Sequence, residues 1–168
     1  MPVPRFDIDL TESQRRVRES IEAICDDFDH EYWRRHAREE TYPHEFVDAL
    51  AAEGWLGVLI PESYEGKGLG TPETVVMMEE IAASGAGFGG AQTIHGGIYN
   101  SPPLVKNASP ERKETLLPKI ARGEVSIQAF GLTEPGAGSN APSMETFARR
   151  EGDEYVVSGE KMWISRVD

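Results

Sequence analysis

Apolar residues recur at helical spacing over most of the chain between residues 1 and 123. The first such set is separated by charged positions and consists of Val17, Ile21, Ile24 and Phe28. Spacing of this kind predicts an amphipathic helix, which we expect to run from about Glu12 to the mid-thirties. Thr11 and Gln14 precede it in the form of a capping box, in which each side chain bonds the other residue's main chain.

Four further segments carry helical signals. Residues 43–53 begin with a proline and are followed by Gly54, which predicts a helix with a glycine stop. Another helix opens at Thr71, and a third at Ser109 with Pro110. Pro118 interrupts that last pattern, so we expect a kink or an early end there. The Gly-rich stretch 85–97 fits either a buried helix or a flexible loop, and we favour the helix because its larger residues keep the period.

The pattern changes after residue 123. Residues 125–130 alternate with period two, which predicts a strand. Residues 146–150 and 155–158 predict two more strands around the turn Glu151–Asp153, and 161–165 continue after a second turn. The expected fold class is therefore α+β: an all-α domain over residues 1–123, then the incomplete beginning of an antiparallel, barrel-like β domain over residues 124–168.

Composition narrows the possible partners. The formal net charge of −12 disfavours nucleic acid and anionic lipid as partners, although a local basic pocket could still bind an anion. We see no signal peptide in the first residues and no apolar run long enough to span a bilayer, so we expect a cytoplasmic protein without membrane association. Cys25 is the single cysteine, and its apolar neighbours predict a small core residue.

The segment Thr133–Asn140 (TEPGAGSN) is the most unusual stretch of the chain. Its glycines allow a backbone to approach a ligand closely, and successive free N–H groups can cradle an anion. From the residues alone, a tight connection between two strands is an equally good explanation. The segment is neither a Rossmann fingerprint nor a Walker loop, because no helix follows it and the Gly-Lys-Ser/Thr ending is absent.

The larger segment Phe130–Ser139 (FGLTEPGAGS) closely resembles the first signature of the acyl-CoA dehydrogenase family. Three other segments resemble that family in the same order: 56–70 its first interhelical loop, 116–124 the entrance to its middle domain, and 148–164 the hairpin and Lys-x-Trp-Ile strand that follow the signature. The resemblance therefore covers nearly the whole chain.

The resemblance implies a role for each matched position in binding FAD. Phe130, Leu132 and Thr133 would lie along the isoalloxazine ring, with Thr133 hydrogen-bonding its polar edge. Gly138 and Ser139 would approach the pyrophosphate, and Ser139 would also border the acyl-CoA substrate. The remaining two positions lie later in the chain, where Trp163 would pack on the flavin and Ser165, in place of the usual Thr, would bond flavin N5.

This sequence departs from the family pattern at two places. Asn140 replaces the usual Asp, and residues 166–168 replace the common Asn-Gly/Ala continuation. The four histidines have no metal-site spacing, so we expect no metal ligand among them, and we expect His30 and His36 to be surface residues.

The implied reaction is FAD-dependent α,β-dehydrogenation of an acyl-CoA thioester in fatty acid and lipid metabolism, with an electron-transferring flavoprotein as acceptor. The family's catalytic Glu lies in a domain beyond Asp168, so no catalytic residue is assigned in this chain, and Glu134 is not that base. We expect the chain alone to be inactive and to bind FAD weakly at best, and the full-length protein to be a dimer or tetramer. Two alternatives stay open: a non-catalytic truncated or split subunit, and a flavin monooxygenase or nitroalkane oxidase relative.

Overall fold

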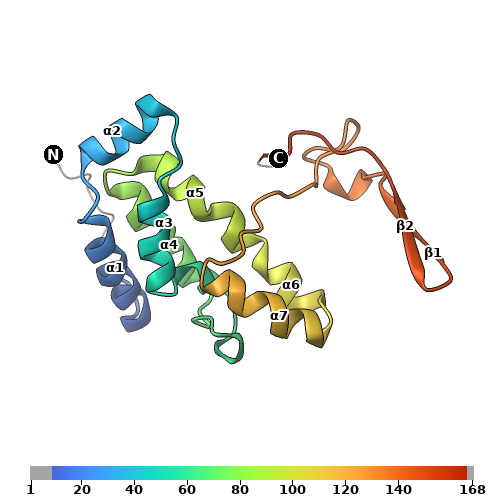
Figure 1. The fold of residues 1–168 in the computed structure, drawn as a ribbon, viewed down its shortest axis with the longest axis horizontal. Helices are drawn as coiled ribbons and strands as arrows, with labels where there is room; N and C mark the ends of the chain where they lie inside the picture. Colours follow the sequence, from blue (N-terminus) through green and yellow to red (C-terminus); the bar gives the residue numbers. More distant parts are fainter. Residues whose placement is uncertain (1–8, 166–168) are drawn as a thin grey trace. The chain divides into compact units, whose positions relative to one another are not determined.

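The computed structural model describes residues 9–165, which form two compact units (Figure 1). The first unit ends at Ile127 and the second begins at Gln128. The first unit is helical, and the second contains a two-stranded antiparallel sheet. This confirms the α+β class that the change of hydrophobic pattern predicts.

The helices of the first unit follow one another with short connections. The α-helices are α1 (Glu12–Cys25), α2 (His30–Glu39), α3 (His44–Ala52), α4 (Thr71–Ala83), α5 (Gly87–Tyr99), α6 (Ser101–Asn107) and α7 (Pro110–Ala121). Two 3-10 turns, η1 (Trp55–Gly57) and η2 (Glu62–Tyr64), lie between α3 and α4. None of the helices within residues 9–165 is both long and apolar enough to cross a membrane.

The first helix begins as predicted but ends much earlier. Thr11 and Gln14 form the full capping box, with N···O distances of 3.2 and 3.0 Å. The helix stops at Cys25, and Asp29 begins a second one by accepting a hydrogen bond from the N–H of Tyr32 at 2.8 Å. The prediction of one helix into the mid-thirties is therefore wrong. Aspartates favour helix N-termini and are unfavourable at C-termini. Asp26 and Asp27 therefore favour the end of α1, and Asp29 caps α2.

The Gly-rich stretch is a helix, α5, as favoured. It buries Ala91, Ile94 and Ile98, whereas the side chain of Phe88 is 79% exposed. Gly90 lets this helix lie against α2, because a Cβ at that position would come within 3.2 Å of the Trp33 ring.

The last helix, α7, runs through Pro118 to Ala121, so the early end predicted there is wrong. Leu117, Ile120 and Ala121 are buried in a small apolar cluster with Ile60. Burial of these side chains offsets the main-chain hydrogen bond that a proline inside a helix removes.

The main core lies between α1, α3, α4 and α5. Its fully buried side chains include Ile21, Phe46, Leu50 and Ile81. Cys25 belongs to this core, as predicted, and burial raises the pKa of its thiol.

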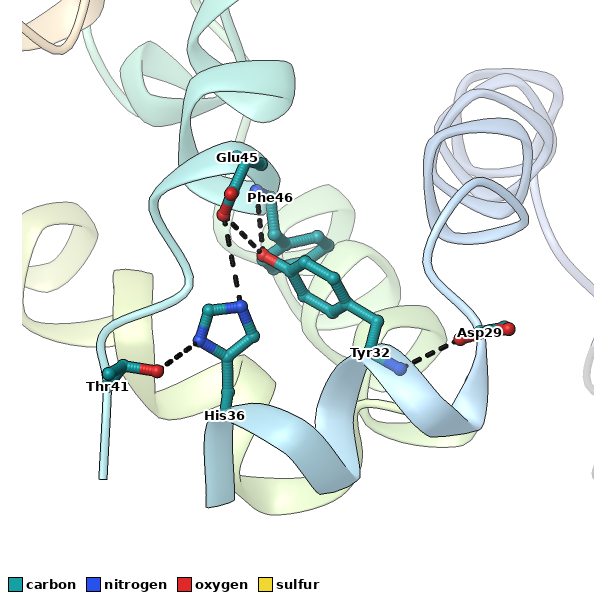
Figure 2. A network of polar contacts seen from close by, with 6 residues as sticks. All are labelled: Asp29, Tyr32, His36, Thr41, Glu45 and Phe46. Carbon is teal, nitrogen blue, oxygen red and sulfur yellow. Dashed lines mark hydrogen bonds and ion pairs between the residues drawn. The ribbon is translucent and has the colours of Figure 1, made fainter. Parts of the chain in front are cut away.

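His36 is a correction to the expected surface histidines, because its side chain is only 12% exposed. Figure 2 shows it between α2 and α3, with Nδ1 2.7 Å from the hydroxyl of Thr41 and Nε2 3.9 Å from a carboxylate oxygen of Glu45. The hydroxyl of Tyr32 donates to the same carboxylate at 3.2 Å. Tertiary packing of α3 on α2 thus covers a residue in a segment that is mostly charged.

An ion pair between α1 and α4 gives a testable consequence. Arg18 lies 3.4 Å from Glu80, and their side chains are 19% and 5% exposed. We expect Arg18→Met to lower the free energy of unfolding by about 3 kcal/mol, because the Glu80 carboxylate stays buried without its cation. Urea unfolding followed by far-UV circular dichroism measures this effect.

Arg16→Met is the matched control for that substitution. Arg16 pairs with Glu12 on the same helix, but both side chains are more than two-thirds exposed, at 71% and 76%. We expect a change within about 0.5 kcal/mol, because water screens an exposed pair. Equal effects of the two substitutions would show that burial of the Arg18 pair contributes nothing.

The second unit contains strands β1 (Phe147–Glu151) and β2 (Glu154–Ser158). They pair antiparallel from Phe147 with Ser158 to Glu151 with Glu154, and Gly152 turns the chain with a φ of 63°. The predicted hairpin is confirmed. The strands predicted at 125–130 and 161–165 are wrong, because neither segment pairs with another strand within residues 9–165. Alternating apolar and polar residues permit a strand, but a strand forms only when its main chain hydrogen-bonds an adjacent strand.

Candidate flavin-binding loop

The candidate site is the loop 130–140 in the second unit, which precedes the short turn η3 (Ala141–Ser143). The loop is irregular except for one tight turn around Pro135 and Gly136. That turn is closed by two hydrogen bonds between the main chains of Glu134 and Ala137, at 3.0 and 3.1 Å. The side chains of Glu134 and Ala137 point inward and are buried, which leaves the glycines of the turn exposed.

The carboxylate of Glu134 anchors this turn from inside. It accepts hydrogen bonds from the main-chain N–H groups of Glu145 at 2.5 Å and Thr146 at 2.9 Å, and from Nζ of Lys161 at 2.8 Å. The ammonium of Lys161 and the surrounding donors lower the pKa of Glu134 to about 2. The group is therefore an ionised structural anchor at neutral pH and unsuited to act as a base there.

Two further contacts bring the segment 161–164 alongside the loop. Nζ of Lys161 also donates to the main-chain oxygen of Leu132 at 3.1 Å, and the N–H of Met162 donates to the main-chain oxygen of Thr133 at 2.9 Å. A Cβ on Gly131 would lie 3.6 Å from the Ile164 side chain. The first part of the signature and the Lys-x-Trp-Ile segment are thus neighbours in space, although about thirty positions separate them in sequence.

The structure places the predicted site residues in two groups. Leu132 and Thr133 lie beside the segment that carries Trp163, whereas Gly138 and Ser139 follow the Glu134–Ala137 turn. Trp163 is 83% exposed and takes a positive φ of 60°, which is uncommon for a bulky residue. Phe130, at 42%, and Ser165 are also exposed. Residues 166–168, where the sequence departs from the family pattern, lie outside the described residues.

Two residues of the site are not predicted from the sequence. Its pattern places Glu134 in the loop without a role and Lys161 in a predicted strand. The pairing of Glu134 with Lys161 depends on the hairpin between them, so no local pattern indicates it.

Comparison with known proteins identifies the family. The N-terminal domain of acyl-CoA dehydrogenases matches residues 11–124, and their middle domain matches residues 129–168. Together these matches cover nearly all of the chain. The chain belongs to the acyl-CoA dehydrogenase family.

Individual proteins that are similar to this chain are also acyl-CoA dehydrogenases. Acyl-CoA dehydrogenase FadE12 of Mycobacterium tuberculosis (strain H37Rv) is 34% identical over 94% of the chain and 40% of its own length. Bovine mitochondrial isovaleryl-CoA dehydrogenase is 33% identical over 93% of the chain and 37% of its own length. The structure of butyryl-CoA dehydrogenase from Megasphaera elsdenii superposes with a TM-score of 0.74 at 26% identity, covering 95% of this chain and 42% of that one. The chain thus spans about 40% of the length of such relatives.

The donors of the loop fit a flavin dinucleotide. Within the part of the chain that the structure describes, the main-chain N–H groups of Leu132, Thr133, Gly138 and Ser139 donate to no protein acceptor. A Cβ on Gly138 would meet nothing within 4 Å, so its backbone is open to a ligand. Free N–H groups suit both the oxygens of a pyrophosphate and the acceptors on the polar edge of an isoalloxazine ring. Residues 9–165 contain no group of three or more His, Cys, Asp or Glu side chains that could hold a metal ion.

Proposed function

We propose that this chain supplies the N-terminal helical domain and the flavin-binding loop of an FAD-dependent enzyme that dehydrogenates an acyl-CoA thioester between its α and β carbons. One observation carries the proposal. Within the described residues, the N–H groups of Leu132 and Thr133 donate to no protein acceptor and lie beside the segment of the exposed Trp163, in a chain that belongs to the acyl-CoA dehydrogenase family.

The bound FAD would accept the hydride that leaves the β carbon. The residues of this chain would hold and orient it. Thr133 would donate its N–H and hydroxyl to the polar edge of the ring, and Phe130 and Leu132 would line the ring. Gly138 and Ser139 would donate to the pyrophosphate, with Ser139 also bordering the acyl-CoA.

The segment 161–165 would complete the flavin side of the proposed site. Trp163 would stack on the ring, and the hydroxyl of Ser165 would hydrogen-bond flavin N5. A serine keeps the hydroxyl of the usual threonine, but it lacks the methyl group that restricts the rotamer.

The base that removes the α proton is proposed to lie outside these 168 residues. Glu134 is unsuited to that role because three donors occupy its carboxylate and lower its pKa to about 2. We propose that the domains are residues 1–123 and 124–168. We also propose that the whole enzyme is a cytoplasmic dimer or tetramer of lipid metabolism that passes its electrons to an electron-transferring flavoprotein.

Trp163→Ala tests the flavin assignment. We expect it to weaken FAD binding about fivefold, because one aromatic contact is lost. Tyr155→Ala is the matched control, since Tyr155 is an aromatic residue that is 66% exposed on the hairpin, and we expect no change. Titration of the chain with FAD, followed by flavin fluorescence, measures both. Absence of FAD both from this chain and from the protein of the native cells would contradict the proposed function.

The second measurement is on the protein from its native cells. We expect an intact mass well above 18.6 kDa and a bound flavin whose absorbance an acyl-CoA bleaches without oxygen. A colourless native protein of 18.6 kDa would instead favour a non-catalytic subunit. The 168-residue chain alone should show no turnover, and turnover would place the base inside it.

A further inference from the structure

We infer that Glu134 and Lys161 form a clamp that holds the flavin-binding backbone in its binding geometry, so that both are positioning residues of the proposed site. The inference rests on the proposed function. It assigns a role to two residues that are expected to act on the loop and not on the flavin or the substrate.

The contacts of the clamp join three separate segments. Lys161 donates to Leu132 in the loop and to the Glu134 carboxylate. That carboxylate also accepts from Glu145 and Thr146, which directly precede the hairpin that Lys161 follows. The loop is thus tied to both ends of the β1–β2 hairpin by one pair of side chains.

The clamp acts on the groups proposed to bind FAD. Within the described residues, the main-chain N–H groups of Leu132 and Thr133 donate to no protein acceptor. The carbonyl oxygens of the same two residues accept hydrogen bonds from Lys161 and Met162. Fixing a carbonyl oxygen also fixes the direction of the N–H in the same peptide unit, because the peptide bond is planar. Lys161 therefore orients the N–H of Thr133. Met162 orients the N–H of Glu134, which closes the turn with Ala137.

The burial and charge of the pair support a structural role. The Glu134 side chain is 5% exposed and that of Lys161 is 22% exposed. Within the described residues, Lys161 is the one side-chain cation bonded to Glu134. Without it, a shielded carboxylate would keep only uncharged donors, and an uncompensated charge of this kind destabilises its surroundings.

The test uses the whole chain without cofactor and measures amide hydrogen exchange by NMR. In Lys161→Met we expect exchange at Ala137, Thr146 and Met162 to rise about tenfold, because removing the charged donor makes local opening easier. Lys161→Arg restores a cation and should restore most of the protection. Arg149→Met breaks the exposed pair of Arg149 with Glu151 on the hairpin and should change nothing at the loop.

Two internal checks keep this result interpretable. The ladder amides of β1 and β2 should stay protected in Lys161→Met, which shows that the second unit is still folded. Unchanged exchange at Ala137, Thr146 and Met162 in that variant would overturn the clamp.

A pH titration gives an independent reading. The pKa of Glu134 in the folded chain is about 2, below its ordinary 4.5, so its stabilisation is complete above about pH 4.5 and is lost as the pH falls toward 2. The amide shifts of Glu145 and Thr146 should therefore move only near pH 2. In Lys161→Met their midpoint should rise, since the main source of the shift is gone. A wild-type midpoint near 4.5 would overturn the clamp.

Adding FAD to the same samples separates the two proposals. We expect FAD to slow exchange at Thr133, Gly138 and Ser139, and Lys161→Met to weaken its binding about tenfold while Lys161→Arg retains it. If FAD protects none of these amides, the proposed function fails even where the cofactor-free clamp stands. If FAD protects them but binds Lys161→Met as tightly as wild type, the flavin proposal stands and the positioning role is wrong.

Discussion

Phe46→Ala is expected to lower the free energy of unfolding of the helical unit by about 4 kcal/mol. The Phe46 ring has no exposed surface and meets the rings of Phe28 at 5.3 Å and Trp33 at 4.9 Å, both edge-on. Removing the ring forfeits its transfer from water and leaves a cavity among stiff aromatic neighbours that cannot collapse into it. Urea unfolding followed by far-UV circular dichroism reports this unit, because the α-helices all lie in it.

Phe88→Ala is the control with the same chemical change. Its ring is 79% exposed on α5, so we expect a difference within about 0.5 kcal/mol. A loss for Phe88 similar to that for Phe46 would mean that residues outside this chain's described fold, or a second copy, cover the α5 face in solution.

Gly66→Ala is expected to cost about 3 kcal/mol. A Cβ at this position would lie 2.0 Å from the main-chain oxygen of Ile60, far inside van der Waals contact. That oxygen accepts a hydrogen bond from the N–H of Gly68 at 2.8 Å, and neighbouring bonds hold the rest of the loop. The clash is with backbone, so the loop itself must move, and with it the buried Ile60.

Gly89→Ala is the matched glycine substitution in the same unit. A Cβ there would meet nothing within 4 Å, and Gly89 lies inside helix α5. Alanine is the better helix former, so we expect a neutral effect or a gain of up to about 1 kcal/mol. In the same denaturant experiment Gly66→Ala should therefore lower the free energy of unfolding and Gly89→Ala should not, and a loss at Gly89 would contradict the packing argument.

The proposed site contains two classes of residue, and none of these stability tests changes either of them. The groups proposed to face the ligand are main-chain donors and exposed side chains, such as Gly138 and Trp163. The groups proposed to support them are Glu134 and Lys161, whose side chains are largely shielded. The sequence predicts the first class because its members lie in the two segments that resemble the family, 130–139 and 161–165. It gives the second class no role, because Glu134 and Lys161 meet only in space.

Features that depend on residues close together in the chain can be predicted from the sequence alone. The capping box of Thr11 and Gln14, the cap at Ser109 and the hairpin turn at Gly152 each involve residues within a few positions, so their patterns predict them directly. The α+β class and the family also follow from the sequence, because both rest on the order of such local segments. The roles of the predicted residues at the flavin stay predictions.

Tertiary structure decided what depends on distant contacts. Helix α7 passes through Pro118 because its last turn is buried against Ile60. Residues 125–130 form no strand, because no second strand pairs with them within residues 9–165. The charge pair of the loop joins residues 27 positions apart, and it exists only once the hairpin has folded back. The free energy of each such contact is set by which partner the fold supplies, and a local pattern does not contain that information.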